Sequence, residues 1–144
     1  MNDFELHPRL VKDTFAVANL NLCKLLLMND SNYPWFILVP RIKNISELFE
    51  LTKVDRQSLN IEVDELSRRL SLHFNAKKMN VAAMGNIVSQ LHIHVIVRKE
   101  TDAAWPNPIW NKVDIAPYKK NISIELIKDI RIIFEDLIVN DKSI

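Results

Sequence analysis

The chain has 144 residues, the size of one ordinary domain, and its 19 Lys and Arg nearly balance its 18 Asp and Glu. This balance does not suit a nucleic-acid-binding surface, and no apolar run reaches the roughly 18 residues of a membrane span, so we expect neither nucleic acid nor a membrane as a partner. The single cysteine, Cys23, and an N-terminus without the apolar stretch of a secretory signal predict a protein of the reducing cytoplasm, with residues 1–144 forming one domain.

Three short apolar runs begin the chain. Residues 14–19 (TFAVAN) form a candidate strand, and residues 22–28 (LCKLLLM) and 35–40 (WFILVP) are apolar runs of strand length. Residues 29–32 (NDSN) lie between the last two and favour a turn, because Asn, Asp and Ser side chains bond to nearby backbone groups. The pattern predicts a β-hairpin, although short apolar runs are also compatible with buried helix.

A long amphipathic helix is predicted over residues 53–74. Thr52 followed by Asp55 resembles a capping box at its start. The apolar residues of its one buried face recur every three or four positions. They are Leu59, Val63, Leu66, Leu70 and Phe74.

A second helix is predicted to follow Ser123, a candidate N-cap residue. Its apolar stripe, within residues 124–138, could face either the core or an interface between two chains. The stripe consists of Ile127, Ile130, Phe134 and Leu137, widened by Ile133 and Ile138.

Two further strands are predicted over residues 77–84 (KKMNVAAM) and 90–97 (QLHIHVIV). The only glycine of the chain, Gly85, lies between them with Asn86, where a hairpin turn is expected. Glycine tolerates a positive φ and also allows close backbone approach, and Gly85 could meet either need.

Two histidines lie two positions apart in the second of these strands. Alternate residues of a strand share a face, so Gln90, His92 and His94 are predicted to lie together and to open into a pocket. The residues between them are apolar and should face the core. A rise of about 3.3 Å per residue places the two imidazoles about 7 Å apart along the strand.

This polar row has three interpretations, and its spacing alone does not decide among them. The first is a solvated strand face. The second is a metal site, but zinc prefers three or four protein ligands and nothing places Cys23 or His73 nearby, so we expect neither a metal nor a cofactor. The third is a histidine nucleophile, because neutral imidazole is available near its pKa of about 6.5.

The stretch GNIVSQLHIHVIVRK, residues 85–99, resembles the signature strand of the histidine triad (HIT) family, in which three histidines alternate with apolar residues after a glycine turn. The hairpin of residues 22–41 is similar to the family's N-terminal hairpin, which ends in Val-Pro-Lys/Arg. The resemblance covers roughly residues 14–115 and is most specific at 85–99 and 33–41.

The resemblance implies an α+β fold with an antiparallel sheet of about five strands, one long helix and a C-terminal helix, and most relatives are homodimers. HIT proteins hydrolyse or transfer nucleotides at the α-phosphorus, where the middle histidine of the triad forms a covalent nucleoside-phosphoryl-histidine. On this basis His92 would be the nucleophile and His94 would bond phosphate oxygens or the leaving oxygen. The attack itself requires no cofactor.

The resemblance also implies binding residues. Asn29 or Asp30 matches the region in which the family binds the ribose hydroxyls. Asn86 matches a polar position beside the phosphate.

Three positions depart from the family pattern. Gln90 replaces the first histidine, Ile87 replaces a frequent Ser or Thr, and Trp35 replaces an additional histidine. Glutamine can bond the His92 ring or a carbonyl but carries no charge. Trp35 is expected to remove a buried polar contact and to place a large ring beside the site. Gln90 and Trp35 favour an alternative function, a nucleotide-binding or interaction module that has lost efficient chemistry.

Residues 101–111 (TDAAWPNPIWN) contain two of the three tryptophans. Their rings could pack on the domain, or they could form a wall of the site or a dimer contact. Arg98 and Asp102 flank the predicted strand end, and Arg98 is expected to be solvated or to meet a phosphate.

Overall fold

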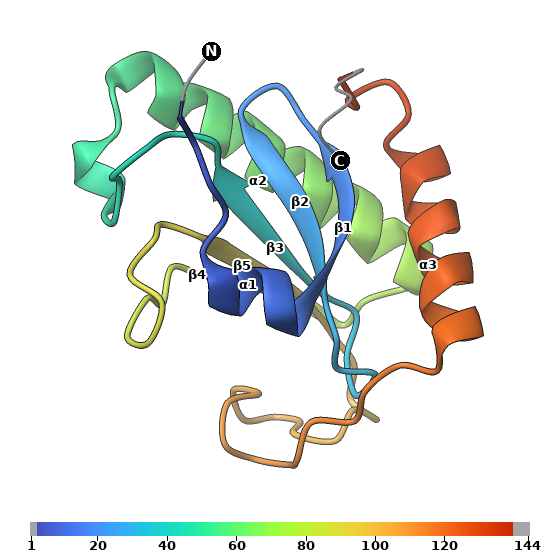
Figure 1. Ribbon diagram of the computed structural model, residues 1–144. Coiled ribbons are helices and arrows are strands. Elements are labelled where there is room, and N and C mark those ends of the chain that lie inside the picture. The colour runs from blue at the N-terminus through green and yellow to red at the C-terminus, as the bar shows by residue number, and fades with distance from the viewer. Residues whose placement is uncertain (1–2, 140–144) are drawn as a thin grey trace.

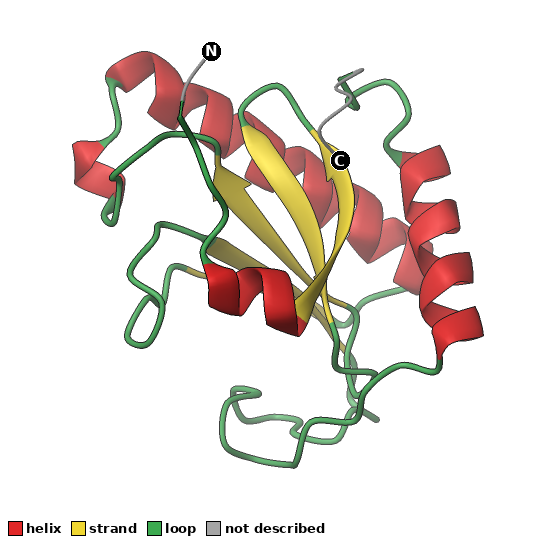
Figure 2. Ribbon diagram, in the orientation of Figure 1, coloured by secondary structure: helices red, strands yellow, loops and turns green. Residues whose placement is uncertain are grey.

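The computed structural model describes residues 3–139. Five strands form one antiparallel sheet in the order β1-β2-β3-β5-β4, so the predicted α+β fold is confirmed (Figures 1 and 2). The strands are β1 (Thr14–Asn19), β2 (Cys23–Met28), β3 (Trp35–Pro40), β4 (Lys78–Ala82) and β5 (Ile93–Arg98). The helices are α1 (Pro8–Asp13), α2 (Lys53–Phe74) and α3 (Lys120–Ile133), with a short 3-10 helix, η1 (Leu48–Glu50).

The predicted N-terminal hairpin is present. Strands β2 and β3 pair antiparallel, with Cys23 opposite Pro40 and Leu27 opposite Phe36. Strand β1 pairs with the other side of β2, with an irregularity between Ala16 and Ala18.

The predicted tight turn between β4 and β5 is wrong. These strands pair antiparallel, but residues 83–92 connect them as a longer loop, and β5 begins only at Ile93. Gly85 does not have a positive φ. A Cβ atom on Gly85 would lie 2.9 Å from the carbonyl oxygen of Val88, so the glycine serves a close backbone approach.

Helix α2 has the predicted bounds. The Thr52 hydroxyl accepts a hydrogen bond from the backbone N–H of Asp55 at 3.1 Å, as expected of an N-cap. The helix ends at Asn75, which adopts the left-handed conformation with φ of 52°. Two other described residues have a positive φ, Asn44 and Asn111, so all three such positions are asparagines.

Helix α3 starts earlier than predicted. It begins at Lys120, and Ser123 lies inside it with its hydroxyl donating to the carbonyl of Lys120 at 3.0 Å. Ser123 is therefore not the N-cap. A hydroxyl that bonds back to the preceding turn is the alternative role of serine in a helix.

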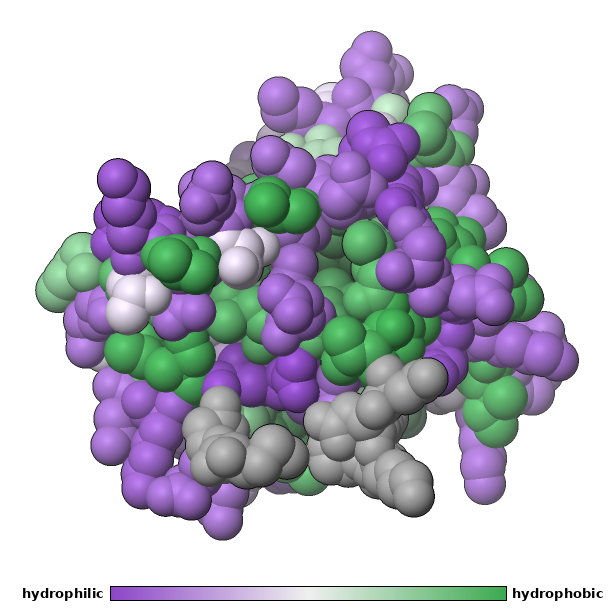
Figure 3. Space-filling view, turned by 90° about the horizontal axis from the view of Figure 1, so that it is seen from above, coloured by the Kyte–Doolittle hydropathy of each residue, from purple (hydrophilic) through white to green (hydrophobic). Residues whose placement is uncertain are grey.

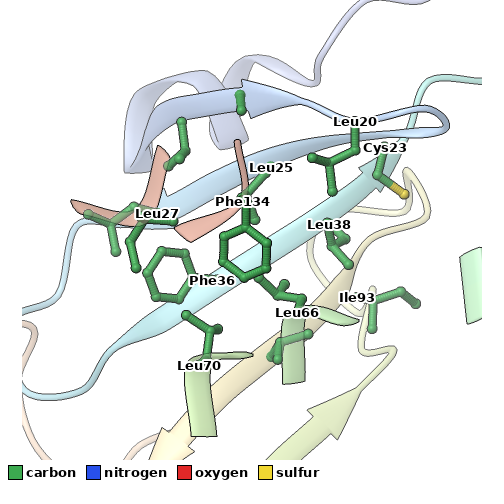
Figure 4. Close-up of a cluster of buried hydrophobic side chains, with 14 of the residues drawn as sticks. Leu20, Cys23, Leu25, Leu27, Phe36, Leu38, Leu66, Leu70, Ile93 and Phe134 are labelled. Atoms are coloured by element: carbon green, nitrogen blue, oxygen red, sulfur yellow. The ribbon is translucent and has the colours of Figure 1, made fainter. Parts of the chain in front are cut away.

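The main core lies on the face of the sheet covered by α2 and α3. Odd-numbered residues of β2 and β5 and even-numbered residues of β3 point into it, as alternation requires. Figure 4 shows Phe36, Leu66 and Phe134 meeting there, which assigns the apolar stripe of α3 to the core.

A second, smaller cluster covers the opposite face of the sheet. It combines Trp35, Ile37 and Ile96 of the sheet with Leu10 of α1 and Ile109 of the 101–111 loop. Figure 1 shows α1 on the side of the sheet opposite α2. Because both faces are covered, every residue of β3 and β5 is buried.

One face of the molecule is mixed in character (Figure 3). On the face seen from above, hydrophobic residues are interspersed with hydrophilic ones (Figure 3). Among residues 3–139, no helix combines the length and apolar character needed to cross a membrane.

Candidate functional site

His92 and His94 lie side by side on the face of the sheet opposite α2 and α3. Their ring centroids are 4.8 Å apart, and they are only 5% and 6% exposed, which excludes a solvated strand face. Both line a cavity of about 340 Å³ that Trp35, Asn86 and Trp110 also line. His94 belongs to β5, whereas His92 precedes the first residue of that strand.

The His92 ring is held by the backbone. Its Nδ1 lies 2.7 Å from the carbonyl oxygen of Gln90. A carbonyl can only accept, so Nδ1 carries the proton and the neutral ring has its lone pair on Nε2. Burial lowers the pKa of His92, the bond to the Gln90 carbonyl raises it, and the charge of His7 lowers it further, with a net decrease. His92 is therefore neutral at pH 7.

The His94 ring has the opposite arrangement. The indole N–H of Trp35 donates to Nδ1 of His94 at 3.0 Å, so the proton of the neutral ring is on Nε2. Burial and the neighbouring His92 lower the pKa of His94 to about 4, against a hydrogen bond with the backbone of Met84 that raises it. The expectation that Trp35 removes a buried polar contact is thus wrong, because its indole provides one.

The two rings offer complementary groups to a ligand in the cavity. His92 has a lone pair that can attack an electrophilic atom, and His94 has an N–H that can bond an oxygen of the same group. Buried, neutral and separately fixed imidazoles are typical of a nucleophile beside a hydrogen-bond donor.

The side chain of Gln90 does not join the histidines in the cavity. Its Oε1 accepts from the N–H of His7 at 2.9 Å, and its Nε2 donates to the carbonyl of Glu5 at 2.8 Å. The predicted shared face of three side chains is therefore wrong for Gln90. The hydrogen bond from Gln90 to the His92 ring is made by its backbone carbonyl.

Asn29 and Asp30 hold the segment that precedes α3. The Asn29 side chain accepts from the N–H of Tyr118 at 2.8 Å, and the buried Asp30 accepts from the N–H groups of Asn32 and Ala116. Asp30 lines a second cavity of about 750 Å³. Trp35, Trp110, Asn111 and Ile115 line both cavities, so the two adjoin.

Among the residues of the 83–92 loop, Asn86 lines the histidine cavity. Ile87 also lines it and is 77% exposed. The loop therefore forms one rim of the cavity.

The two tryptophans of residues 101–111 have different positions. The Trp110 ring lies 5.2 Å from the His94 ring and 6.0 Å from the Trp35 ring, so it forms a wall of the cavity. Trp105 packs on the domain instead, where the Arg98 guanidinium lies 5.6 Å from its ring. Trp105 thus packs on the domain and Trp110 forms a wall of the cavity, whereas a dimer contact of this loop stays a prediction.

Arg98 is neither solvated nor available to a phosphate, contrary to both expectations. It is 2% exposed and forms an ion pair with Asp102 at 2.8 Å. Its guanidinium also donates to Asn80 at 2.7 Å and lies over the ring of Tyr33. This ion pair secures the end of β5 and the start of the 101–111 loop.

Sequence reasoning missed the contribution of α1. Arg9, Leu10 and Asp13 of this six-residue helix line the histidine cavity. The available signal was Pro8, because proline favours the first turn of a helix.

The candidate metal ligands are dispersed. His73 packs against Phe74, and Cys23 is buried in the main core. In the part of the chain described, from residue 3 to 139, no three His, Cys, Asp or Glu residues are grouped so as to hold a metal ion. Independence from metal stays a prediction.

Comparisons with known proteins identify relatives of this chain. The model of the HIT domain family matches residues 9–101. The solved structure of a histidine triad protein from Marinobacter aquaeolei VT8 is 43% identical, with a TM-score of 0.90, and the match covers 93% of this chain and 98% of that one. No curated protein matches the chain.

Two rhizobial proteins give similar results. A histidine triad (HIT) protein from Sinorhizobium meliloti 1021 is 39% identical with a TM-score of 0.88, and one from Bradyrhizobium japonicum is 36% identical with a TM-score of 0.87. Each match covers 94% of this chain and 98% of the other. The family model spans more than half of the sequence and these relatives align with nearly all of it, so the chain belongs to the histidine triad family.

Proposed function

We propose that the protein hydrolyses or transfers nucleotides at the α-phosphorus through a covalent phosphoryl-histidine on His92. Membership of the HIT family supports a nucleotide-binding or hydrolase-type function in general terms. The phosphoryl-histidine mechanism rests on one observation. Two buried histidines line one cavity, and their hydrogen bonds leave a lone pair on His92 and an N–H on His94.

The bonds formed and broken follow from the two tautomers. Nε2 of His92 attacks the phosphorus, the N–P bond forms, and the bond to the leaving group breaks with its electron pair leaving on that group, which takes its proton from water. The Gln90 carbonyl at Nδ1 stabilises the positive charge of the phosphorylated ring. Water or another acceptor then attacks the phosphorus and releases its proton to solvent, the N–P bond breaks, and its electrons return to Nε2.

His94 acts as a hydrogen-bond donor in this scheme. With a pKa of about 4 it is neutral at pH 7, so its Nε2–H bonds a phosphate or leaving-group oxygen without carrying a charge. The bound oxygen would replace the backbone of Met84 as the partner of His94. No metal or cofactor takes part in these steps.

The adjoining larger cavity suits the nucleoside. Asp30, which lines this cavity, can accept a ribose hydroxyl with its second carboxylate oxygen, whereas Asn29 lines neither cavity and holds Tyr118 instead. Asn86 lies on the histidine side, where it can bond the phosphate. Trp35 and Trp110 line both cavities and offer flat apolar surfaces to the substrate.

The alternative is a nucleotide-binding or interaction module without efficient chemistry. It rested on Gln90 and Trp35 replacing histidines. Trp35 nevertheless bonds His94, and the backbone carbonyl of Gln90 bonds the His92 ring. These contacts favour the enzyme.

Turnover of a substrate panel tests the proposal. The panel contains adenosine phosphoramidates, dinucleoside polyphosphates and nucleoside-phosphate sugars. We expect His92→Ala and His92→Asn to abolish turnover, because the covalent pathway is lost. His94→Ala should reduce turnover less, by the roughly 10²–10³-fold typical of losing one hydrogen-bond donor to a developing charge. A rapid quench should trap a phosphoryl-histidine that is acid-labile and base-stable.

The outcomes separate the two functions. Nucleotide binding without turnover of any panel member would support the binding module. An adduct on His94, or normal turnover by the His92 variants, would contradict the assigned roles.

A further inference from the structure

The amide of Gln90 bridges the candidate site to the N-terminal segment. It accepts from the N–H of His7 at 2.9 Å and donates to the carbonyl of Glu5 at 2.8 Å. We call these two hydrogen bonds the Gln90 bridge. It uses both halves of the amide, so it needs a side chain with a donor and an acceptor at the end of a two-carbon stem.

The bridge acts on a part of the backbone that the sheet does not fix. Residues 89–92 lie outside the strand ladder, which starts at Ile93. Yet the carbonyl of Gln90 is the group that bonds Nδ1 of His92. The N–H of Leu91 also donates to the carbonyl of Ile45 at 2.9 Å and so helps to secure this stretch.

The other end of the bridge leads directly into a wall of the cavity. His7 accepts a hydrogen bond from the N–H of Arg9 and so caps α1. Leu10 of α1 is buried in the second cluster, with Phe4 and Leu6 packed against it. Displacing residues 5–7 would therefore disturb both the Gln90 carbonyl and the wall that α1 provides.

We propose that Gln90 is a positioning residue for the reaction proposed above: its amide fixes residues 5–7 against the stretch before β5 and thereby holds its own carbonyl at the His92 ring. Glutamine at the first position of the motif thus has a structural role of its own in the site, and its presence is not merely the loss of a histidine. A histidine at position 90 would carry its donor and acceptor on a rigid ring, so we expect it not to reproduce both hydrogen bonds of the amide.

Three variants and two measurements on the protein without substrate test this role. Gln90→Met keeps the length and removes both hydrogen bonds, Gln90→Glu keeps the shape and loses the donor, and Gln90→His introduces the residue of the family motif. Hydrogen exchange reports the bridge at the His7 amide, which should exchange roughly tenfold faster in Gln90→Met. Imidazole ¹⁵N shifts report the tautomer of His92, which should change from Nδ1–H alone to a mixture.

Kinetics add the functional consequence. We expect kcat to fall up to about 10²-fold in Gln90→Met and Gln90→His, with a smaller change in KM, because a displaced nucleophile loses its alignment. Gln90→Glu should be intermediate, since its carboxylate can still accept from His7.

Lys43→Met is the matched control. It removes an exposed ion pair at 3.6 Å between Lys43 and Asp3 of the same N-terminal segment, and it should leave all three readouts unchanged. Unaltered His7 exchange and an unaltered His92 tautomer in Gln90→Met would overturn the proposal, as would a Gln90→His variant more active than the natural protein. If no nucleotide is turned over by any form, the proposed function fails, while the exchange and tautomer data still decide the role of Gln90.

Discussion

The ring of His94 is neutral and buried, which links the stability of the protein to pH. Its pKa is lowered from 6.5 to about 4, whereas in the unfolded chain it should titrate near 6.5. Between these values the unfolded chain binds a proton that the folded chain does not, so the free energy of unfolding decreases as the pH falls. The full difference in the pKa of His94 corresponds to about 3 kcal/mol in the free energy of unfolding.

We therefore predict that His94→Asn flattens the dependence of stability on pH. Asparagine keeps an oxygen that can accept from the Trp35 indole, but it does not titrate. Urea unfolding at several values between pH 7 and pH 4 measures the effect, and the loss on acidification should be smaller than in the natural protein by up to about 3 kcal/mol.

His73→Asn removes an exposed imidazole and serves as the control, which should keep the natural pH dependence. An equal loss of stability on acidification in His94→Asn and in the natural protein would contradict the prediction.

The sequence alone predicted that His92 and His94 would lie together, because period-two spacing fixes the faces of a strand. It could not predict their tautomers. The partner of His94 is Trp35, 59 residues away, and the partner of His92 is a carbonyl whose direction depends on the loop before β5. The Gln90 side chain does not share the face of His92 and His94, because it bonds backbone groups of the N-terminal segment. A strand pattern does not reveal such partners.

At the scale of elements, the Arg98–Asp102 ion pair joins β5 to the loop that carries Trp110. Asp102 is buried with Arg98 and also accepts from the N–H groups of Lys99, Ala104 and Trp105. Removing one member of a buried pair leaves the other charge without its partner. Such a loss typically costs about 3–5 kcal/mol.

We predict that Arg98→Met lowers the free energy of unfolding by about 3–5 kcal/mol, as measured by urea denaturation. Adding Asp102→Asn should recover part of this loss, because the remaining side chain is then neutral and still accepts from the turn. Lys77→Met, which breaks an exposed ion pair with Glu100 at 2.9 Å, should cost less than about 1 kcal/mol. If the losses of unfolding free energy from Arg98→Met and Asp102→Asn simply add in the double variant, the two charges are not coupled.

The strongly periodic helix α2 was predicted well, whereas the short helix α1 and the irregular 83–92 loop were not. Helix α2 has the predicted bounds because five apolar residues and the Thr52 cap agree. Helix α1 has only six residues, too few for a periodic pattern, and its one buried residue is Leu10. The sequence predicted a hairpin turn in place of the 83–92 loop, because a single glycine does not indicate the length of the connection between two strands.

At the scale of the whole molecule, β4 is an edge strand with one unpaired side. It pairs only with β5 among the described strands, and Val81 in it is 50% exposed. An exposed edge can pair with another chain through its free N–H and C=O groups. The family resemblance predicts a homodimer, and we expect its interface at this edge, residues 78–82.

We predict that the protein is a dimer in solution and that Val81→Lys shifts it toward the monomer, as measured by analytical ultracentrifugation. A lysine on each of two paired edges would place like charges close together. Val11→Lys, which adds the same charge at a 59% exposed position of α1, should remain dimeric. A natural protein that sediments as a monomer at all concentrations would refute the prediction.

The three left-handed asparagines have a consequence for the unfolded chain. Asn44, Asn75 and Asn111 occupy backbone positions where glycine would be unstrained, and the one glycine lies elsewhere. Asparagine tolerates this conformation better than other non-glycine residues, at a modest cost in strain. Because glycine has the most conformational freedom to lose, a chain with a single glycine begins folding from a less disordered ensemble. The folded protein accepts local strain at three loop positions, and its unfolded state has correspondingly less backbone entropy.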